Sequence, residues 1–390
     1  MPACNHKSSR RPRIAYVFNH SYLLGGGEIS LSELIRSIDK NRFEPVVIVP
    51  NDGEIKTSHE EKKIKVLINS LPSLKHITLG KPAQSLVTLS RILKANAVDI
   101  IHANGSRACL YGGLAGRFLG IPVIWHVRES LKDSFVYDGL LVLLAQIVVC
   151  VSKSVQIKRF ARYGNLMKTK GIIVYNGVDT QKFKKSETRR QSFRKLLNIR
   201  GNDILFGVVG NIIPRKGQDF LVRGLDRARI RKPNLSVKTL FIGRALDSAF
   251  DETLHQMVLN RNLGGEVIFM GYTEQITDIF SALDVFVLPS KSEGFSRSLL
   301  EAMSSGLPVL ATRTGEIAEA VIEGLNGILI DYNDVEEMAS AIIKLSENET
   351  LRENMGNENR QRAVGHFDLK SHANSIETLY VNLLSNPDVS

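Results

Sequence analysis

The chain has 390 residues, 43% of them hydrophobic and 23% charged, with a formal net charge of +11. These proportions are typical of a soluble globular protein, and the length exceeds what one hydrophobic core usually supports, so we expect two domains. The longest apolar run, residues 139–151, is too short to cross a bilayer, which argues against an integral membrane protein.

The positive charge is concentrated in the first half of the chain. Residues 1–180 hold 25 Lys and Arg against 13 Asp and Glu, whereas the remaining residues hold 26 against 27. A basic face could attract an anionic membrane, an acidic glycan or nucleic acid, or the charges could be dispersed and merely solvated. Because no helix-turn-helix, aromatic stacking motif or zinc-ligand pattern appears, we expect no nucleic-acid partner.

The cysteines and the first residues bear on the compartment. Cys4, Cys109 and Cys150 are odd in number and widely separated, which favours free thiols in a reducing environment and gives no metal-ligand spacing. The opening residues are basic and polar and lack the apolar core of a secretion signal. We therefore expect a cytoplasmic protein without a structural metal.

The first half alternates short β-branched runs with longer amphipathic segments, the pattern of a parallel sheet covered by helices. Strands are predicted at residues 14–18, 46–49, 99–102, 123–126, 147–151 and 172–175, and helices at residues 28–38, 86–95, 108–119 and 153–162. Residues 1–180 are interpreted as one doubly wound, Rossmann-like domain.

A second unit of the same kind follows a polar, turn-rich stretch. Residues 181–200 are interpreted as the linker and residues 201–367 as the second domain. Strands are predicted at residues 204–209, 238–242, 267–270, 285–288, 308–311 and 327–330, and helices at residues 296–304, 335–346, 350–367 and 369–385. Two such domains are expected to face one another across a cleft at the carboxyl ends of their strands, where doubly wound folds bind ligands.

Glu293 and Glu301 are the most informative residues of the second domain. They lie eight positions apart in E-G-F-S-R-S-L-L-E, with Glu293 on the loop after a buried strand and Glu301 in the following helix. Two helical turns span about seven residues, so both carboxylates can face one crevice and hold separate groups of hydroxyls. Alternatively, one glutamate caps the helix and the other is a solvated charge.

Arg215 and Lys216, in N-I-I-P-R-K-G, follow the first strand of this domain. Cations at the start of a helix are unfavourable unless an anion is nearby, so the pair could bind an anionic ligand. Alternatively, the pair is only a charged helix start. The first domain has G-G-G-E in the corresponding place. Gly25, Gly26 and Gly27 would let the backbone approach a phosphate at a helix N-terminus, although a flexible loop needs no ligand.

Polar residues also end two strands of the first domain. His126, in W-H-V-R-E, should point into the cleft, or it is only a satisfied rim residue. Arg128 and Glu129 are candidates for contacts with a ligand, with a local ion pair as the alternative. His102 and Asn104, in H-A-N-G-S, occupy another strand end.

The stretch from Glu293 to Glu301, with the residues that continue it as A-M-S-S-G-L-P-V-L-A-T-R-T-G-E-I-A-E, resembles the E-x7-E region of the family 4 retaining glycosyltransferases. R-K-G matches the family's Arg or Lys pair followed by Gly. G-G-G matches its glycine-rich donor loop, and His126 matches its strand-end histidine. The chain departs from the family pattern at Asn211, where many members have Arg. It also departs at Asn104, which stands where the family often has the second His of His-x-His. The second glycine of a Gly-x-Gly turn is also missing after Gly243.

The resemblance implies the GT-B fold, with the acceptor handled by the first domain and a UDP- or GDP-sugar by the second. In that fold the last helix, here within residues 368–390, crosses back to the first domain. His126, Arg215, Lys216 and Glu293 are the implied catalytic residues. Donor binding is implied for Gly25, Gly26, Gly27, Arg215, Lys216, Glu293, Gly294, Phe295, Ser296, Ser298, Leu299 and Glu301, and acceptor binding for Asn104, Arg128 and Glu129.

The sequence therefore predicts a retaining hexosyltransferase with no metal or other cofactor. Family frequency favours a glycan or lipid-linked acceptor in polysaccharide, lipopolysaccharide or glycolipid assembly, at the inner face of an anionic membrane. Two alternatives stay open: a nucleotide-sugar epimerase of the same architecture, and a non-catalytic nucleotide-sugar-binding subunit. The nucleotide, sugar, acceptor, linkage and oligomeric state are not specified.

Overall fold

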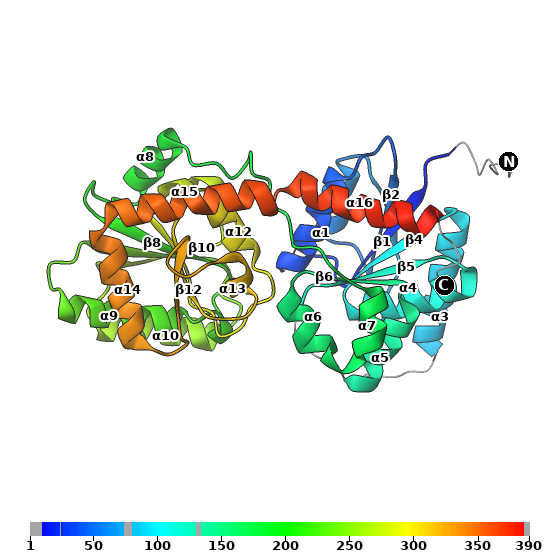
Figure 1. Cartoon of the computed structure of the whole chain (residues 1–390), viewed down its shortest axis with the longest axis horizontal. Coiled ribbons are helices and arrows are strands. Elements are labelled where there is room, and N and C mark those ends of the chain that lie inside the picture. The colour runs from blue at the N-terminus through cyan, green and yellow to red at the C-terminus, as the bar shows by residue number, and fades with distance from the viewer. Residues whose placement is uncertain (1–9, 24, 74–79, 130–133, 386–390) are drawn as a thin grey trace. The chain divides into compact units, whose positions relative to one another are not determined.

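The computed structural model describes residues 10–23, 25–73, 80–129 and 134–385; Cys4 lies outside this part of the chain. The chain divides into two compact units, residues 1–176 with 370–390 (unit 1) and residues 177–369 (unit 2). Each unit is one parallel sheet covered by helices (Figure 1). The prediction of two Rossmann-like α/β domains is confirmed.

Unit 1 contains a seven-stranded sheet in the order β3-β2-β1-β4-β5-β6-β7, and every strand pairing is parallel. Its strands are β1 (Arg13–Phe18), β2 (Glu44–Val49), β3 (Lys65–Ile68), β4 (Ile100–Asn104), β5 (Val123–Val127), β6 (Ile147–Cys150) and β7 (Gly171–Ile173). The strand order reverses between β1 and β4, and the loops after these strands diverge there.

The helices of unit 1 cover both faces of this sheet. They are α1 (Gly26–Ser37), α2 (Glu54–Glu60), α3 (Gly80–Ala95), α4 (Ser106–Leu119), α5 (Phe135–Leu144), α6 (Lys153–Phe160), the 3-10 helix η1 (Ala161–Tyr163), α7 (Gly164–Lys170) and α16 (Leu369–Ser385). Helices α1 and α16 bury apolar side chains against one face of the strands. Figure 1 shows α5, α6 and α7 on the opposite side.

Unit 2 contains a six-stranded parallel sheet in the order β10-β9-β8-β11-β12-β13. Its strands are β8 (Ile204–Val209), β9 (Val237–Ile242), β10 (Val267–Gly271), β11 (Val285–Leu288), β12 (Val309–Thr312) and β13 (Gly327–Ile330). The strand order reverses between β8 and β11.

The core of unit 2 joins α9, α10 and α14 to one face of the sheet. Its helices are α8 (Glu187–Leu196), η2 (Pro214–Lys216), α9 (Gln218–Arg231), α10 (Ser248–Asn260), α11 (Ile276–Ala282), α12 (Arg297–Ser304), α13 (Ile317–Ala320), α14 (Val335–Glu347) and α15 (Glu349–His366). Strands buried on both faces explain why their sequences are continuous apolar runs rather than alternating ones.

The segment interpreted as a linker, residues 181–200, differs from that interpretation because it contains α8. The Ser186 side chain caps this helix by accepting a hydrogen bond from the Arg189 backbone N–H. Arg190 and Arg194 both pair with Asp284, just before β11, at 2.6 and 2.9 Å. The charges that suggest a solvated linker instead attach α8 to unit 2, and the chain passes between units at residues 176 and 177.

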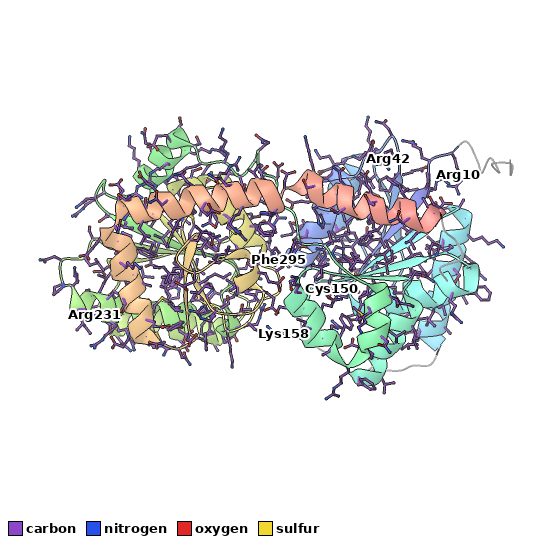
Figure 2. The ribbon with its side chains drawn as sticks, in the orientation of Figure 1. Arg10, Arg42, Cys150, Lys158, Arg231 and Phe295 are labelled. Carbon is purple, nitrogen blue, oxygen red and sulfur yellow. The ribbon has the colours of Figure 1, made fainter. Side chains whose placement is uncertain are left out.

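Helix α16 returns the end of the chain to unit 1. Arg42, labelled in Figure 2 beside this helix, pairs with the buried Glu377 at 2.7 Å. The Glu377 carboxylate also accepts a hydrogen bond from the Asp39 backbone N–H. The polar face of α16 is therefore tied to unit 1 by specific contacts as well as by its apolar residues.

None of the helices in the described part of the chain combines the length and apolarity that crossing a membrane requires. Cys109 and Cys150 are buried free thiols, and burial raises the pKa of Cys150 to about 12.

Candidate active site

The candidate site of unit 2 lies where β8 and β11 end, at the reversal of the strand order. The loop after β8 leads into η2, which holds Arg215 and Lys216, and the loop after β11 carries Glu293. Lys216 Nζ lies 2.7 Å from Glu293 Oε1, and Arg215 Nη1 lies 3.9 Å from Glu293 Oε2. The structure thus brings three of the predicted residues together.

Hydrogen bonds to backbone carbonyls also join these two loops. Arg215 Nη1 donates to the Ser292 carbonyl at 2.8 Å, and the Lys291 backbone N–H donates to the Arg215 carbonyl at 2.9 Å. Gly217 has a φ of +69°, and a Cβ there would lie 2.1 Å from the Pro289 carbonyl oxygen. The glycine of R-K-G is therefore required for the close approach of the two loops.

The two cations differ in their exposure. The side chain of Arg215 is 49% exposed, whereas those of Lys216 and Glu293 are 14% and 6% exposed. Lys216 thus neutralises a buried carboxylate, while Arg215 can reach a ligand. An anionic group placed here would meet a largely buried amine and a half-exposed guanidinium.

Glu301 lies on α12 and forms an ion pair that the sequence analysis missed. Arg297 Nη2 is 2.7 Å from Glu301 Oε1, and both side chains are largely buried. The i, i+4 spacing within the motif is the signal that could have predicted this pair. Arg297 therefore holds the Glu301 carboxylate in one orientation.

The start of α12 presents backbone donors. Ser296 is the residue before the helix and makes no capping hydrogen bond with its side chain, whose hydroxyl lies 3.3 Å from that of Ser298. Leu299 belongs to the first turn and is buried, and Phe295 packs against Phe367 with ring centroids 5.4 Å apart. Packing thus fixes the loop from Gly294 onward next to the helix start.

Unit 1 has its own polar constellation, centred on His126 at the end of β5. Its Nδ1 lies 3.0 Å from Nε2 of His102, on β4, and His102 Nδ1 lies 2.7 Å from the hydroxyl of Tyr380, on α16. All three side chains are buried. His126 Nε2 is buried without a hydrogen-bond partner among the described residues.

Arg128 is held beside this histidine rather than extended into solvent. Its guanidinium donates to Asn104 Oδ1 and to Asn176 Oδ1, both at 2.6 Å, and Nη2 lies 3.4 Å from His126 Nδ1. A Cβ on Gly27 would lie 3.2 Å from Arg128 Cδ. At least one glycine of G-G-G thus makes room for an arginine.

Burial determines the protonation of this constellation. Burial lowers the pKa of His102 to about 3 and that of Arg128 to about 10. It also lowers the pKa of His126 well below its usual range, and the positive charge of Arg128 is the next largest cause of that shift. Burial also raises the pKa of Glu28, at the start of α1. His126 is therefore a neutral hydrogen-bonding group at neutral pH.

The histidine cluster includes His372 of α16, whose ring centroid is 6.3 Å from that of His126. No local sequence signal could have found His372 and Tyr380, which lie more than 240 residues from His126.

Two other predicted residues of unit 1 lie outside this cluster. Glu129 is exposed, and no ion pair between it and Arg128 is observed. Gly25 precedes α1 as its cap residue, without a side chain to bond the first turn.

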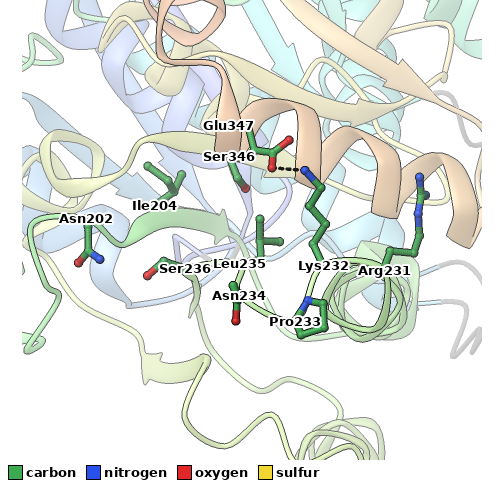
Figure 3. Close-up of a pocket in the computed structure, with 10 residues that line it drawn as sticks. All are labelled: Asn202, Ile204, Arg231, Lys232, Pro233, Asn234, Leu235, Ser236, Ser346 and Glu347. Atoms are coloured by element: carbon green, nitrogen blue, oxygen red, sulfur yellow. Dashed lines mark hydrogen bonds and ion pairs between the residues drawn. The ribbon is translucent and has the colours of Figure 1, made fainter.

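No group of three His, Cys, Asp or Glu side chains within the described ranges could hold a metal ion. A hollow of about 490 Å³ in unit 2 lies elsewhere, beside the start of β8 and the residues before β9 (Figure 3). Lys232 and Glu347 form an ion pair at its wall. Because its lining is at the amino ends of the strands, this hollow is separate from the candidate site.

Comparison with known protein families gives two matches. Residues 24–182 match the model described as Glycosyltransferase Family 4, and residues 189–362 match the model described as Glycosyl transferases group 1. Together these models span most of the chain.

Full-length relatives agree with these matches. The UDP-Gal:alpha-D-GlcNAc-diphosphoundecaprenol alpha-1,3-galactosyltransferase of Escherichia coli is 26% identical, over 96% of this chain and 98% of that protein. The capsular polysaccharide biosynthesis glycosyltransferase CapM of Staphylococcus aureus is 24% identical, over 87% of this chain and 90% of that protein.

Among solved structures, Anabaena Alr3699/HepE in complex with UDP and glucose matches with a TM-score of 0.82 and 26% identity. The match covers 94% of this chain and 99% of that one. None of these relatives supports the epimerase alternative. The chain belongs to the family 4 glycosyltransferases and has their GT-B fold.

Proposed function

We propose that this glycosyltransferase transfers a hexose from a UDP-sugar, with retention of anomeric configuration, to a lipid-linked or glycan acceptor in surface polysaccharide assembly. The observation that carries the proposal is the joining of Arg215, Lys216 and Glu293 where β8 and β11 end. The Escherichia coli and Anabaena relatives are named with UDP-galactose and with UDP, which favours UDP over GDP.

Unit 2 binds the donor in this proposal. Arg215 and Lys216 stabilise the charge that develops on the diphosphate as the bond to the sugar breaks. The backbone N–H groups of Ser298 and Leu299, at the start of α12, add donors for the same phosphates. Glu301, oriented by Arg297, accepts hydrogen bonds from the ribose hydroxyls.

Glu293 binds the sugar hydroxyls, and the backbone of Gly294, Phe295 and Ser296 approaches the sugar and the phosphates. Glu293 is paired with Lys216 in the structure. A diphosphate that attracts Lys216 would free the carboxylate for the sugar. This exchange of partners links recognition of the two parts of the donor.

Unit 1 contributes hydrogen bonds from a neutral His126, and Gly25, Gly26 and Gly27 lie at the start of α1 to admit a phosphate. Arg128, Asn104 and Glu129 serve the acceptor. Arg128 is preorganised for this role, because two asparagine oxygens already fix its guanidinium. Preorganised donors lose little entropy when substrate binds.

The cationic pair replaces a metal ion at the diphosphate, and retention follows if the acceptor attacks from the face that the diphosphate leaves. A diphosphate oxygen then takes the acceptor proton. The protein acts at the inner face of an anionic membrane, where an acceptor linked to a lipid would be presented.

Thermal unfolding in the presence of UDP- and GDP-sugars tests the donor. A ligand at a hundred times its dissociation constant adds about 2.7 kcal/mol to the free energy of unfolding. Turnover with the preferred donor, followed by NMR of the product anomeric proton, then tests retention. An inverted product, or an isomerised donor without transfer, would refute the proposal.

A further inference from the structure

The guanidinium of Arg128 carries a charge that no carboxylate neutralises among the described residues. Its hydrogen bonds go to the side-chain oxygens of Asn104 and Asn176, which are neutral groups. Burial is the main cause that lowers its pKa to about 10, so the guanidinium is still charged at neutral pH. A charge that is removed from water without a counter-ion costs free energy, and such a group is more often found at a binding site than in a purely structural role.

Arg128 also has N–H groups that its neighbours do not use. A guanidinium has five of them. Within the described ranges, Nε donates to Asn104, Nη1 donates to Asn176, and Nη2 lies 3.4 Å from His126 Nδ1. One N–H on Nη1 and one on Nη2 are left, and the other contacts fix the plane of the guanidinium that carries them.

Ring nitrogens without partners lie in the same cluster. His126 Nε2 and both ring nitrogens of His372 are buried and have no hydrogen-bond partner in the described part of the chain. The two rings are 6.3 Å apart, centroid to centroid. A neutral imidazole has one N–H, so His372 has an unused donor in either tautomer. A ligand oxygen would recover the free energy that a buried donor without an acceptor costs.

Arg128 is close enough to both imidazoles to act on their charge. Burial, and after it the positive charge of Arg128, lowers the pKa of His126 and that of His372. A contact with the Tyr175 backbone has the opposite effect on His372, but it lies outside hydrogen-bond geometry. The cluster therefore combines one fixed cation with neutral donors.

One acidic side chain, Glu28 in the first turn of α1, is near enough to raise the pKa of Arg128. It forms no ion pair with Arg128 among the described residues. Its Oε2 would lie 3.2 Å from a Cβ on Gly25, so the carboxylate turns back over the start of its own helix. Burial also raises the pKa of Glu28, which disfavours its charged form. The charge of Arg128 is thus left for a ligand to neutralise.

We propose that Arg128, with His126 and His372 beside it, binds an anionic group of the acceptor, a phosphate or a carboxylate. The inference deepens the proposed function and rests on it, because there unit 1 handles the acceptor. Arg215 and Lys216 of unit 2 already supply cations for the donor diphosphate, so a second cationic centre in unit 1 indicates a second anion. A neutral hydroxyl would satisfy the N–H groups but would leave the charge uncompensated, whereas guanidinium and oxyanion pair strongly.

Calorimetric titration of inorganic pyrophosphate into the whole protein saturated with UDP tests the proposal. UDP occupies the donor site, so further binding reports a second anion site. Arg128→Gln and His372→Phe should each weaken this binding by about ten-fold or more, the loss expected for a hydrogen bond to a charged group. Arg91→Gln, which changes an exposed arginine of α3, is the matched control and should bind as the wild type does. Malonate, titrated in parallel, distinguishes a carboxylate site from a phosphate site.

Thermal unfolding with and without UDP separates this site from donor binding. Variants that lose pyrophosphate or malonate binding but keep UDP-dependent stabilisation support the inference. If Arg128→Gln does not fold, His372→Phe decides, because it leaves every contact of Arg128 in place.

Three results would overturn the inference: neither probe binds the UDP-saturated wild type, Arg128→Gln binds as Arg91→Gln does, or pyrophosphate binds only without UDP. The last would assign Arg128 to the donor diphosphate. A protein that UDP does not stabilise would count against the proposed function, whereas failure of probe binding in a protein that UDP does stabilise counts against the inference alone.

Discussion

Lys216 Nζ and Glu293 Oε1 are 2.7 Å apart although 77 residues separate them in sequence. Both side chains are largely buried, so each charge depends on the other for its compensation. A pair that neutralises itself without substrate must rearrange when a charged ligand arrives. This ion pair consequently has two roles, one in stability and one in binding, and they can be separated.

Replacing Lys216 with Met should reduce both properties. Loss of one partner of a buried ion pair typically costs about 3–5 kcal/mol, because the remaining charge is left uncompensated. Loss of a donor to the leaving diphosphate should lower kcat by about 100- to 1,000-fold. Urea unfolding and steady-state kinetics measure the two effects, with Lys291→Met, an exposed lysine of the adjoining loop, as the control.

Adding Glu293→Gln to Lys216→Met should restore most of the lost stability, because no buried charge then lacks a partner. Activity should stay low, since neither the cation nor the sugar-binding carboxylate is present. Recovery of both stability and activity in the double variant would show that the pair is structural only.

Removing the Tyr380 hydroxyl should impair His126 without unfolding the protein. The hydroxyl lies 2.7 Å from His102 Nδ1, and His102 in turn contacts His126, so Tyr380 acts as a positioning residue. Loss of a partner that orients a functional side chain typically costs about 10- to 100-fold in activity. Kinetics of Tyr380→Phe should show a fall in kcat together with a changed pH profile.

Tyr111→Phe is the control for this change, because the Tyr111 hydroxyl donates a hydrogen bond to the Pro72 carbonyl, away from the histidines, whereas the Tyr380 hydroxyl contacts His102 and donates to the Tyr16 hydroxyl. Its kcat should stay near that of the wild type. If Tyr380→Phe and Tyr111→Phe have the same kinetics and pH profile, the contact with His102 does not position His126.

The sequence predicted local features well and long-range contacts poorly. Strands β8, β11 and β13 have the predicted bounds, because buried apolar runs between polar turns are a local signal. The pairing of Arg215 and Lys216 with Glu293 could be anticipated only through the expectation that strand ends converge. The contact of Tyr380 with His102 spans 278 residues and depends on where α16 packs, which no local pattern encodes.

Polar composition was misleading for α8. Its arginines look solvated in sequence, yet Arg194 is buried against Asp284 and the carbonyls around it. A charged side chain can be buried when its partners are fixed by the tertiary fold, and these partners lie far away in sequence. The same reason explains why Arg128 and Asn104 could be named from the sequence, whereas their hydrogen bond and the second partner, Asn176, could not.

Stability should fall as pH drops from neutral toward 4. Burial is the main cause of three lowered pKa values. The pKa of His102 falls to about 3, that of His372 to about 4, and that of His126 to well below its usual range. The unfolded chain protonates these side chains near pH 6.5 while the folded protein does not, so unfolding takes up protons. Each such group should add about 1.4 kcal/mol per pH unit to the slope of stability against pH.

Urea unfolding at a series of pH values measures this slope. His372→Phe removes one buried histidine while keeping an aromatic ring, so the slope between pH 6 and pH 4.5 should become shallower by about 1.4 kcal/mol per pH unit. An unchanged slope in this variant would contradict a neutral buried His372.

Gly217→Ala should weaken both the fold and donor binding. A left-handed φ of +69° costs a non-glycine residue about 1–2 kcal/mol, and the added Cβ would lie 2.1 Å from the Pro289 carbonyl oxygen, so the loops after β8 and β11 must also separate. Separation moves Lys216 away from Glu293.

Gly264→Ala, where an added Cβ meets nothing within 4 Å, is the control and should change stability by less than about 0.5 kcal/mol. A Gly217→Ala protein that matches this control in urea unfolding and in UDP-dependent thermal stabilisation would show that the site does not depend on the close approach of its two loops.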